Sequence, residues 1–160
     1  MSTAFPQRPR PRLGAAKRKF ALVASQFNAR YVQGLVNHAT EEIRALVPNA
    51  LLNLYQVPGA FEIPIVVREL ATRDDIDAIL AIGVIIKGGT SHAEHLATSV
   101  TNALQQIAIE RGVPVINAVL SLEDEDQARE RCLEKKINRG IEAARAAVQI
   151  AGVMQELRRK

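Results

Sequence analysis

Residues 77–92 read Asp77-Ala78-Ile79-Leu80-Ala81-Ile82-Gly83-Val84-Ile85-Ile86-Lys87-Gly88-Gly89-Thr90-Ser91-His92. The run from Ala78 to Ile86 is almost wholly apolar, which is typical of a strand buried on both faces of a parallel sheet. The glycine pair predicts a turn, and the Ser-x-x-Glu spacing of Ser91 and Glu94 predicts the capping box of a helix. The free amides and the dipole of a helix's first turn attract anions. This stretch therefore predicts a strand, a turn suited to an anion, and a helix that carries a histidine.

The rest of the chain repeats this alternation of apolar runs and amphipathic stretches. Short connections between alternating strands and helices are typical of βαβ units, so we expect an α/β fold with a parallel sheet. Four strands are expected, at about 20–24, 50–56, 78–86 and 114–120. Five helices are expected, at about 32–46, from Pro64 to about 70, from Ser91 to Gly112, from a cap at Ser121-Leu122-Glu123-Asp124, and over 139–157.

The composition supports one α/β domain. The chain has 160 residues, of which 48% are hydrophobic and only 4% aromatic, so a core of Ala, Val, Ile and Leu is expected. Cys132 is the only cysteine, which excludes an internal disulfide and favours a reducing, cytoplasmic location. We expect no association with a membrane, because no stretch has the length of a transmembrane helix or the apolar core of a secretory signal.

The basic charge is concentrated at the N-terminus. The net charge is +4, and six of the basic residues lie in the first nineteen positions, among three prolines. We therefore expect residues 1–18 to form a flexible basic arm and residues 19–160 to form the single domain. A role of the arm in binding a polyanion stays open, but a solubilising leader is the plainer interpretation, and no nucleic-acid partner is expected.

Ligands of open α/β sheets bind beyond the carboxyl ends of the strands. Four connections lie there, at 25–31, 57–64, 87–92 and 117–121. Together they contain an aromatic ring, a carboxylate, a glycine turn and a histidine. This combination predicts a site for planar, polar and phosphorylated substrates.

Two other kinds of site are weaker candidates. The spacing Gly83-x-x-x-x-Gly88-Gly89-Thr90 is similar to a nucleotide P-loop, but it lacks the lysine that reaches the β- and γ-phosphates. His92 and His95 are close enough in sequence to bind a metal, yet no cysteine or carboxylate triad accompanies them, so no metal is expected. His38, on the first helix, is expected to be a surface residue.

Taken together, the connecting segments resemble the 6,7-dimethyl-8-ribityllumazine synthase family, over a region from about Phe20 to Leu157. The resemblance implies a three-layer α/β/α fold with a doubly wound, flavodoxin-like sheet, and a pentamer whose active sites lie between neighbouring subunits. It rests on Ser25-Gln26-Phe27-Asn28, Val57-Pro58-Gly59-Ala60-Phe61-Glu62-Ile63-Pro64, the stretch from Gly83 to His92, Pro114-Val115-Ile116-Asn117-Ala118-Val119-Leu120, and Gln127-Ala128 with Arg131.

The reaction that this resemblance implies belongs to riboflavin biosynthesis. It condenses 5-amino-6-(D-ribitylamino)uracil with 3,4-dihydroxy-2-butanone 4-phosphate, releases phosphate, and uses no cofactor and no metal. Two alternatives stay open: an archaeal-type riboflavin synthase, which shares this fold, and a shell protein that binds lumazine or flavin without catalysis. Riboflavin synthase is also a candidate partner, and the sequence leaves open whether pentamers assemble further.

The resemblance also implies roles for individual residues. Phe27 would stack on the pyrimidine, and Asn28 and Glu62 would orient the ribityl chain. His92 would carry protons, and Arg131 of the adjacent subunit would bind the phosphate. The other substrate-binding residues would be Gly59, Ala60, Phe61, Val84, Ile85, Ile86, Gly89, Thr90, Asn117 and Arg139.

Several positions depart from the family pattern. Lys87 stands where arginine is frequent, Gly89 where alanine or another small residue is common, and Arg139 where a lysine is usual. Asn117 stands where some members have an aromatic residue and others asparagine, and Ala93-Glu94-His95 replaces a run that is usually rich in aromatic residues. These departures concern the shape and affinity of the pocket more than the type of reaction.

Overall fold

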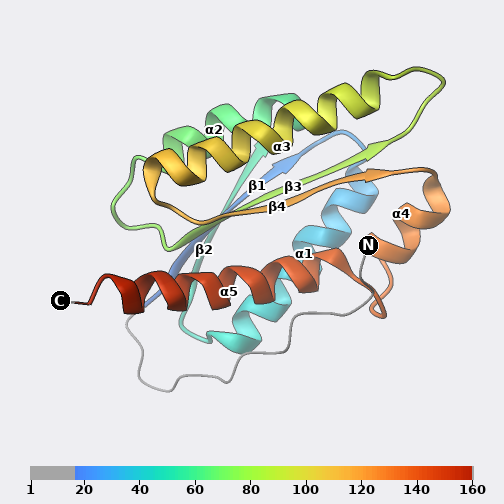
Figure 1. Cartoon of the computed structure of the whole chain (residues 1–160). Coiled ribbons are helices and arrows are strands. Elements are labelled where there is room, and N and C mark those ends of the chain that lie inside the picture. The colour runs from blue at the N-terminus through green and yellow to red at the C-terminus, as the bar shows by residue number, and fades with distance from the viewer. Residues whose placement is uncertain (1–16, 160) are drawn as a thin grey trace.

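The computed structural model describes residues 17–159 and shows a three-layer α/β/α fold (Figure 1). Its sheet has four parallel strands in the order β2-β1-β3-β4, which is the flavodoxin-like order, so the predicted fold class is confirmed. The strands are β1 Lys19–Ser25, β2 Leu51–Val57, β3 Ala78–Ile86 and β4 Val115–Leu122. The helices are α1 Ala29–Leu46, the short 3-10 helix η1 Ala60–Glu62, α2 Ile63–Leu70, α3 His92–Arg111, α4 Glu125–Cys132 and α5 Arg139–Leu157.

The central strand β3 explains the continuous apolar run. Leu80 and Ile82 pack into a core with α1, α4 and α5, whereas Ile79 and Ala81 pack into a second core with α2 and α3. Because successive side chains of a strand point to opposite faces, a strand covered on both sides must be apolar at every position. In Figure 1, α2 and α3 cover one face of the sheet and α1, α4 and α5 cover the other.

Helices α1 and α5 approach each other closely at Gly140. A Cβ atom at Gly140 would press directly on the backbone carbonyl oxygen of Leu35, which cannot swing away as the end of a side chain could. This contact brings the start of α5 against α1 and thereby places Arg139, the first residue of α5.

We expect Gly140→Ala to lower the free energy of unfolding by about 1–3 kcal/mol, the usual cost of overpacking. The matched control is Gly152→Ala on the same helix, where the nearest neighbour of the new Cβ, Arg18 Nη2, would be 3.6 Å away. This control should be neutral or should stabilise by up to about 1 kcal/mol, because alanine favours a helix more than glycine does. Urea denaturation measures both changes, and equal effects in the two variants would contradict the packing argument.

Three local expectations differ from the structure. Ser121 and Leu122 belong to β4, and the cap of α4 is Asp124, whose side chain accepts a hydrogen bond from Gln127 N. Ser91 precedes α3 but makes no side-chain capping bond, so the expected capping box is wrong. His38 is half-buried rather than a surface residue, because its Nε2 lies 3.1 Å from the carbonyl oxygen of Leu133.

The predicted arm, residues 1–18, lies outside the described residues except for Lys17 and Arg18. Arg18 is buried, and its guanidinium donates to Val148 O at 3.1 Å and to Gln155 Oε1 at 3.2 Å, both on α5. The ordered body of the protein therefore already includes Arg18. Within residues 17–159, no helix is long and apolar enough to span a membrane.

Candidate functional site

Asn28 lies at the point where the order of the strands reverses, between the carboxyl ends of β1 and β3. Its backbone has φ 55° and ψ 45°, a left-handed conformation that asparagine tolerates better than most residues. The side-chain amide donates from Nδ2 to the carbonyl oxygen of Val84 at 2.8 Å. Asn28 thus links the β1–α1 turn to β3 at the place where α/β sheets of this topology bind ligands.

Phe27 is held outward by its neighbours. The backbone N–H of Gln26 donates to Val57 O at 2.9 Å, and the N–H of Phe27 donates to Pro58 O at 3.3 Å. These bonds fix the loop after β1 against the loop after β2, while the Phe27 ring remains 72% exposed. A large aromatic ring that is exposed to water on an anchored loop offers a face on which a planar ligand can stack.

The loop after β2 places a carboxylate beside this ring. A Cβ atom at Gly59 would lie 3.0 Å from Glu62 Oε2 and 3.5 Å from the Phe27 ring, so both groups border Gly59. The intervening Ala60 is buried, whereas Phe61 is 67% exposed. The sequence-predicted residues Phe27, Asn28, Gly59, Glu62 and Val84 are therefore brought together, and we call them the aromatic cluster.

The end of β3 adds backbone groups to the aromatic cluster. Pairing of β1 with β3 ends at Ala24 and Ile82, so the part of β3 that continues to Ile86 has no strand beside it on the β1 side. Successive backbone groups of a strand alternate between its two neighbours, so Ile86 faces the same side as Val84. Ile85, between them, is buried and pairs with β4.

Residues 88–91, which we call the glycine turn, connect β3 to α3. All four are exposed, and a Cβ atom at Gly88 or Gly89 would have no neighbour within 4 Å. Within residues 17–159, the only side-chain hydrogen bond of the turn is long, with 3.5 Å between the donor His92 N and the acceptor Thr90 Oγ1. Gly89, Thr90 and His92 therefore lie at the same edge of the sheet as the aromatic cluster, and His92 is exposed to solvent.

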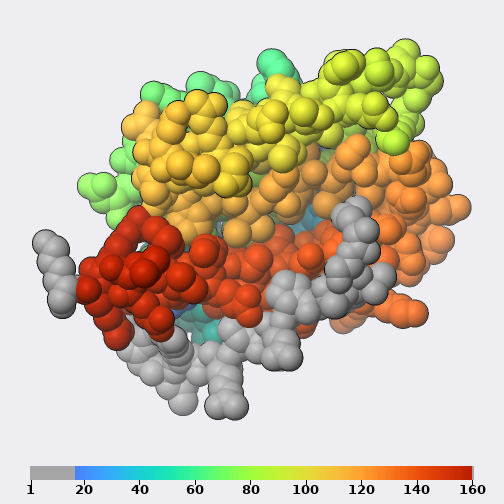
Figure 2. Space-filling view, viewed as in Figure 1, coloured from blue at the N-terminus to red at the C-terminus, as the bar shows by residue number. Residues whose placement is uncertain are grey.

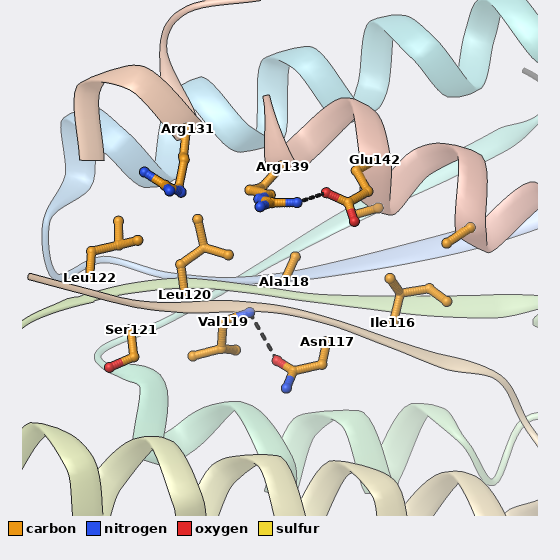
Figure 3. A pocket seen from close by; sticks show the side chains of 12 residues that line it. Ile116, Asn117, Ala118, Val119, Leu120, Ser121, Leu122, Arg131, Arg139 and Glu142 are labelled. Atoms are coloured by element: carbon orange, nitrogen blue, oxygen red, sulfur yellow. Dashed lines mark hydrogen bonds and ion pairs between the residues drawn. The ribbon is translucent and has the colours of Figure 1, made fainter. Parts of the chain in front are cut away.

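A hollow of about 480 Å³ lies between β4 and the helices α4 and α5 (Figure 3). Arg131, Arg139 and Glu142 line it, and we call them the arginine cluster. Arg139 Nη1 forms an ion pair with Glu142 Oε2, and Arg131 Nη1 contacts Glu130 Oε2 at 3.2 Å. The Nε of Arg131 is buried and has no hydrogen-bond partner among the described residues. Two guanidinium groups thus border a hollow at the edge strand β4, whose side chains Figure 2 shows at the surface between α3 and α5.

Asn138 positions the arginine cluster. Its side chain is fully buried and caps α5 by accepting from the N–H groups of Gly140 at 2.9 Å and Ile141 at 3.2 Å. Its Nδ2 donates to Glu134 O at 2.9 Å. This role was not predicted from the sequence, although an asparagine directly before a helix is a recognisable capping signal.

Asn117 does not join the arginine cluster. Its side chain lies on the α3 side of β4, where Nδ2 donates to Thr101 Oγ1 at 3.1 Å and Oδ1 accepts from Val119 N at 3.0 Å. Figure 3 shows Asn117 pointing away from Arg131 and Arg139. Glu142 was also missed, although its position three residues after Arg139 on a helix indicates an ion pair.

The two clusters do not meet within one chain. The lining of the hollow contains none of the aromatic-cluster residues, and neither Thr90 nor His92. The aromatic cluster lies at the ends of β1, β2 and β3, whereas the arginine cluster lies against β4 at the edge of the sheet. One subunit therefore carries two separate clusters, one partly aromatic and one rich in charge.

The described residues offer little for metal or thiol chemistry. Residues 17–159 contain no group of three or more His, Cys, Asp or Glu side chains placed to hold a metal ion. Cys132 is buried, and burial raises the pKa of its thiol to about 12. Because the thiolate is the nucleophile, Cys132 is unreactive near neutral pH.

Comparisons with known proteins agree on one family. The family model described as 6,7-dimethyl-8-ribityllumazine synthase matches residues 17–155, which include both clusters. A relative from Halorhodospira halophila (strain DSM 244 / SL1), described as 6,7-dimethyl-8-ribityllumazine synthase, is 39% identical over 140 residues. This alignment covers 87% of this chain and 90% of the relative. The chain therefore belongs to the 6,7-dimethyl-8-ribityllumazine synthase family.

Proposed function

We propose that the protein condenses 5-amino-6-(D-ribitylamino)uracil with 3,4-dihydroxy-2-butanone 4-phosphate to give 6,7-dimethyl-8-ribityllumazine. The observation that carries this proposal is the position of the aromatic cluster, where the order of the strands reverses between β1 and β3. The chain matches the family model over residues 17–155, which include this cluster. A planar pyrimidine with a polyhydroxy chain needs a ring to stack on, hydrogen-bonding groups at its edge, and a carboxylate for its hydroxyls. Phe27, the end of β3, and Glu62 supply these three kinds of contact.

The pyrimidine substrate would bind on the aromatic cluster. Phe27 stacks on the ring, and the backbone of Val84 and Ile86 contacts the ring edge. Glu62 accepts hydrogen bonds from the ribityl hydroxyls. Asn28, whose amide already donates to Val84 O, keeps the Phe27 loop in place and presents its remaining oxygen to the ribityl chain.

The second substrate would bind with its phosphate at the glycine turn. Gly89 and Thr90 offer backbone amides and a hydroxyl at the start of α3, where the helix dipole favours an anion. The missing side chains at Gly88 and Gly89 leave the backbone open to a close approach. His92, in the first turn of α3, is then placed to exchange protons with the reacting atoms.

The chemistry needs positioning and proton transfer more than a reactive nucleophile. The pyrimidine amine adds to the ketone and loses water to form an imine, phosphate is then eliminated, and ring closure with loss of a second water gives the lumazine. Much of the rate gain would come from holding both reactants together. His92 would carry protons between these steps, and a guanidinium would stabilise the departing phosphate.

The arginine cluster would complete this site from a neighbouring subunit. Arg131 supplies the charge for the phosphate. Its buried Nε has no hydrogen-bond partner among the described residues and would gain an acceptor in this site. The gain matters because a buried donor without a partner costs about 1–3 kcal/mol. Arg139 would contact the substrate ring. A contact between two different surfaces of the same chain gives a ring when its rotation closes, and we propose a pentamer of this kind.

Exposed apolar side chains on β2 and on the segment that follows it support this assembly. Leu51 and Leu54 on the edge strand β2 are about half exposed, and Phe61 and Ile65 are about two-thirds exposed. A second subunit would remove these side chains from water. We further propose a cytoplasmic location and riboflavin synthase, which consumes the lumazine, as the partner in the pathway.

Product analysis with purified protein tests the proposed function. With both substrates present, we expect 6,7-dimethyl-8-ribityllumazine and inorganic phosphate in equal amounts, identified by absorbance and mass. A second reaction contains the lumazine alone. Formation of riboflavin there would identify a riboflavin synthase, and absence of product from the first reaction, with lumazine bound, would identify a non-catalytic binding protein.

A further inference from the structure

Lys87, at the entrance of the glycine turn, contacts two carboxylates. It directly precedes Gly88, and its Nζ lies 2.6 Å from Glu123 Oε1, at the end of β4. The same Nζ lies 3.7 Å from Glu94 Oε1, in the first turn of α3 after the turn. Lys87 therefore joins the entrance of the glycine turn, its exit, and the neighbouring strand.

Glu123 is itself held in place. Its backbone N–H donates to Gln127 Oε1 at 3.1 Å, and Gln127 N donates to Asp124 Oδ1, the cap of α4, at 2.8 Å. Next to it, the backbone N–H of Lys87 donates to Leu122 O at 2.9 Å. The backbone of Glu123 is thus tied to the first turn of α4, and its carboxylate extends from there to Lys87.

The glycine turn has little packing of its own. Its four residues are exposed, Ser91 makes no capping bond, and nothing lies close to the Cα atoms of Gly88 and Gly89 on the side where a Cβ would stand. Glycine residues also leave the backbone more freedom than any other residue. A ligand that binds through backbone amides would meet an ensemble of turn conformations unless another contact restricts them.

We propose that Lys87 and Glu123 form a positioning pair that holds the glycine turn in the conformation that receives the phosphate. This inference rests on the proposed function of the turn, and it assigns to Lys87 no direct contact with the phosphate. The charge of Lys87 is already shared between two carboxylates. The hydrogen bond to Glu123 is the largest of the effects that raise the pKa of Lys87.

The variant Glu123→Gln distinguishes two roles of Lys87, positioning of the glycine turn and direct binding of phosphate, by the direction in which phosphate affinity changes. If Lys87 bound phosphate directly, removal of a nearby negative charge would strengthen phosphate binding. If the pair positions the turn, the same change loosens the turn and weakens binding. The two explanations therefore predict opposite changes in one measured affinity.

The first measurement is calorimetric binding of inorganic phosphate to the assembled protein, and the second is the KM for each substrate. In Glu123→Gln we expect the affinity for phosphate to fall about tenfold and the KM for the butanone phosphate to rise about tenfold. This effect is smaller than the loss of about 10²-fold in rate that a misplacement of 1 Å can cause. The KM for the pyrimidine should not change. Melting temperature should change little, because exposed ion pairs add little to folding stability.

Two further variants complete the test. Lys87→Met should reproduce the effect, and Lys87→Arg, which keeps the charge and the reach, should restore most of the phosphate affinity. Asp126→Asn is the matched control, because it removes an equal charge from the same end of α4 at a side chain that is 91% exposed and contacts Arg129 instead. It should leave phosphate binding unchanged or slightly stronger.

Tighter or unchanged phosphate binding in Glu123→Gln would overturn the positioning role. Equal weakening in Glu123→Gln and Asp126→Asn would overturn it too. Failure of the proposed function gives a different result, because the unaltered protein would then make no lumazine while its phosphate affinity could still be compared with that of the variants.

Discussion

Arg131→Met and Phe27→Ala proteins should each lose most of their activity, and a mixed assembly of the two should recover about a quarter of the normal activity. Arg131 belongs to the arginine cluster and Phe27 to the aromatic cluster, and the two clusters do not meet within one chain. We expect Arg131→Met to lose about 10²–10³-fold in kcat/KM, the usual cost of removing a group that stabilises charge in a transition state. Phe27→Ala should lose about 10–10²-fold, because stacking of an aromatic side chain on a base contributes about 1–3 kcal/mol. Co-expression of two differently tagged chains, followed by purification on both tags and assay, measures the recovery.

The recovery follows from the geometry of a ring. Each site would join the aromatic cluster of one subunit to the arginine cluster of the next. In a random mixture of equal amounts, an intact aromatic cluster meets an intact arginine cluster at about one site in four. All other combinations contain at least one altered side chain.

The matched control combines Arg131→Met with Arg139→Met. Both substitutions lie in the arginine cluster, so every site of this mixture keeps a defect and no recovery is expected. Mass measurements on the mixed assemblies establish that the chains have combined. Mixed assemblies of the first pair that stay inactive would refute a site shared between subunits.

The strands of this fold could be predicted because burial leaves a clear pattern in the sequence. β3 is covered on both faces, so its apolar run is continuous, and its observed bounds coincide with the prediction. The end of β4 was less visible, because Ser121 and Leu122 resemble a helix cap in sequence. Leu122 is buried in the core with α1, α4 and α5, so the strand continues to that residue and Asp124 becomes the cap.

The aromatic cluster could be predicted from topology alone. Parallel strands end at one edge, so the loops that carry Phe27 and Glu62 had to share that edge with the end of β3. The side of β4 on which the Asn117 side chain lies could also be predicted. Successive side chains of a strand point to opposite faces of the sheet, so Asn117 must lie on the face opposite to that of Ile116 and Ala118.

Other features of the site depend on tertiary contacts that no local pattern shows. The bond from Asn117 to Thr101 joins residues on different elements, and the pair of Lys87 with Glu123 joins the ends of two strands. The separation of the two clusters follows from the position of β4 at the edge of the sheet, which depends on strand order rather than on residue types. Sequence spacing alone therefore identifies the candidate residues, but it does not show which of them lie together within one subunit.

His92→Ala should lower kcat by about 10²-fold and leave the KM of both substrates nearly unchanged. The imidazole is proposed to move protons between steps, and it is exposed in the first turn of α3 without a side-chain hydrogen bond among those described. Its removal should therefore affect neither folding nor binding. We expect the lower end of the range for acid–base catalysis, because holding the two reactants together would supply much of the rate gain.

His95→Ala is the matched control, since His95 is also exposed on α3, one turn further along. Its kcat should equal that of the unaltered protein. Steady-state rates at saturating concentrations of each substrate, together with calorimetric binding of inorganic phosphate, separate the two possible roles of His92. A higher KM for the butanone phosphate with an unchanged kcat would assign His92 to phosphate binding, because a residue that acts only on the reacting protons changes the barrier and not the affinity.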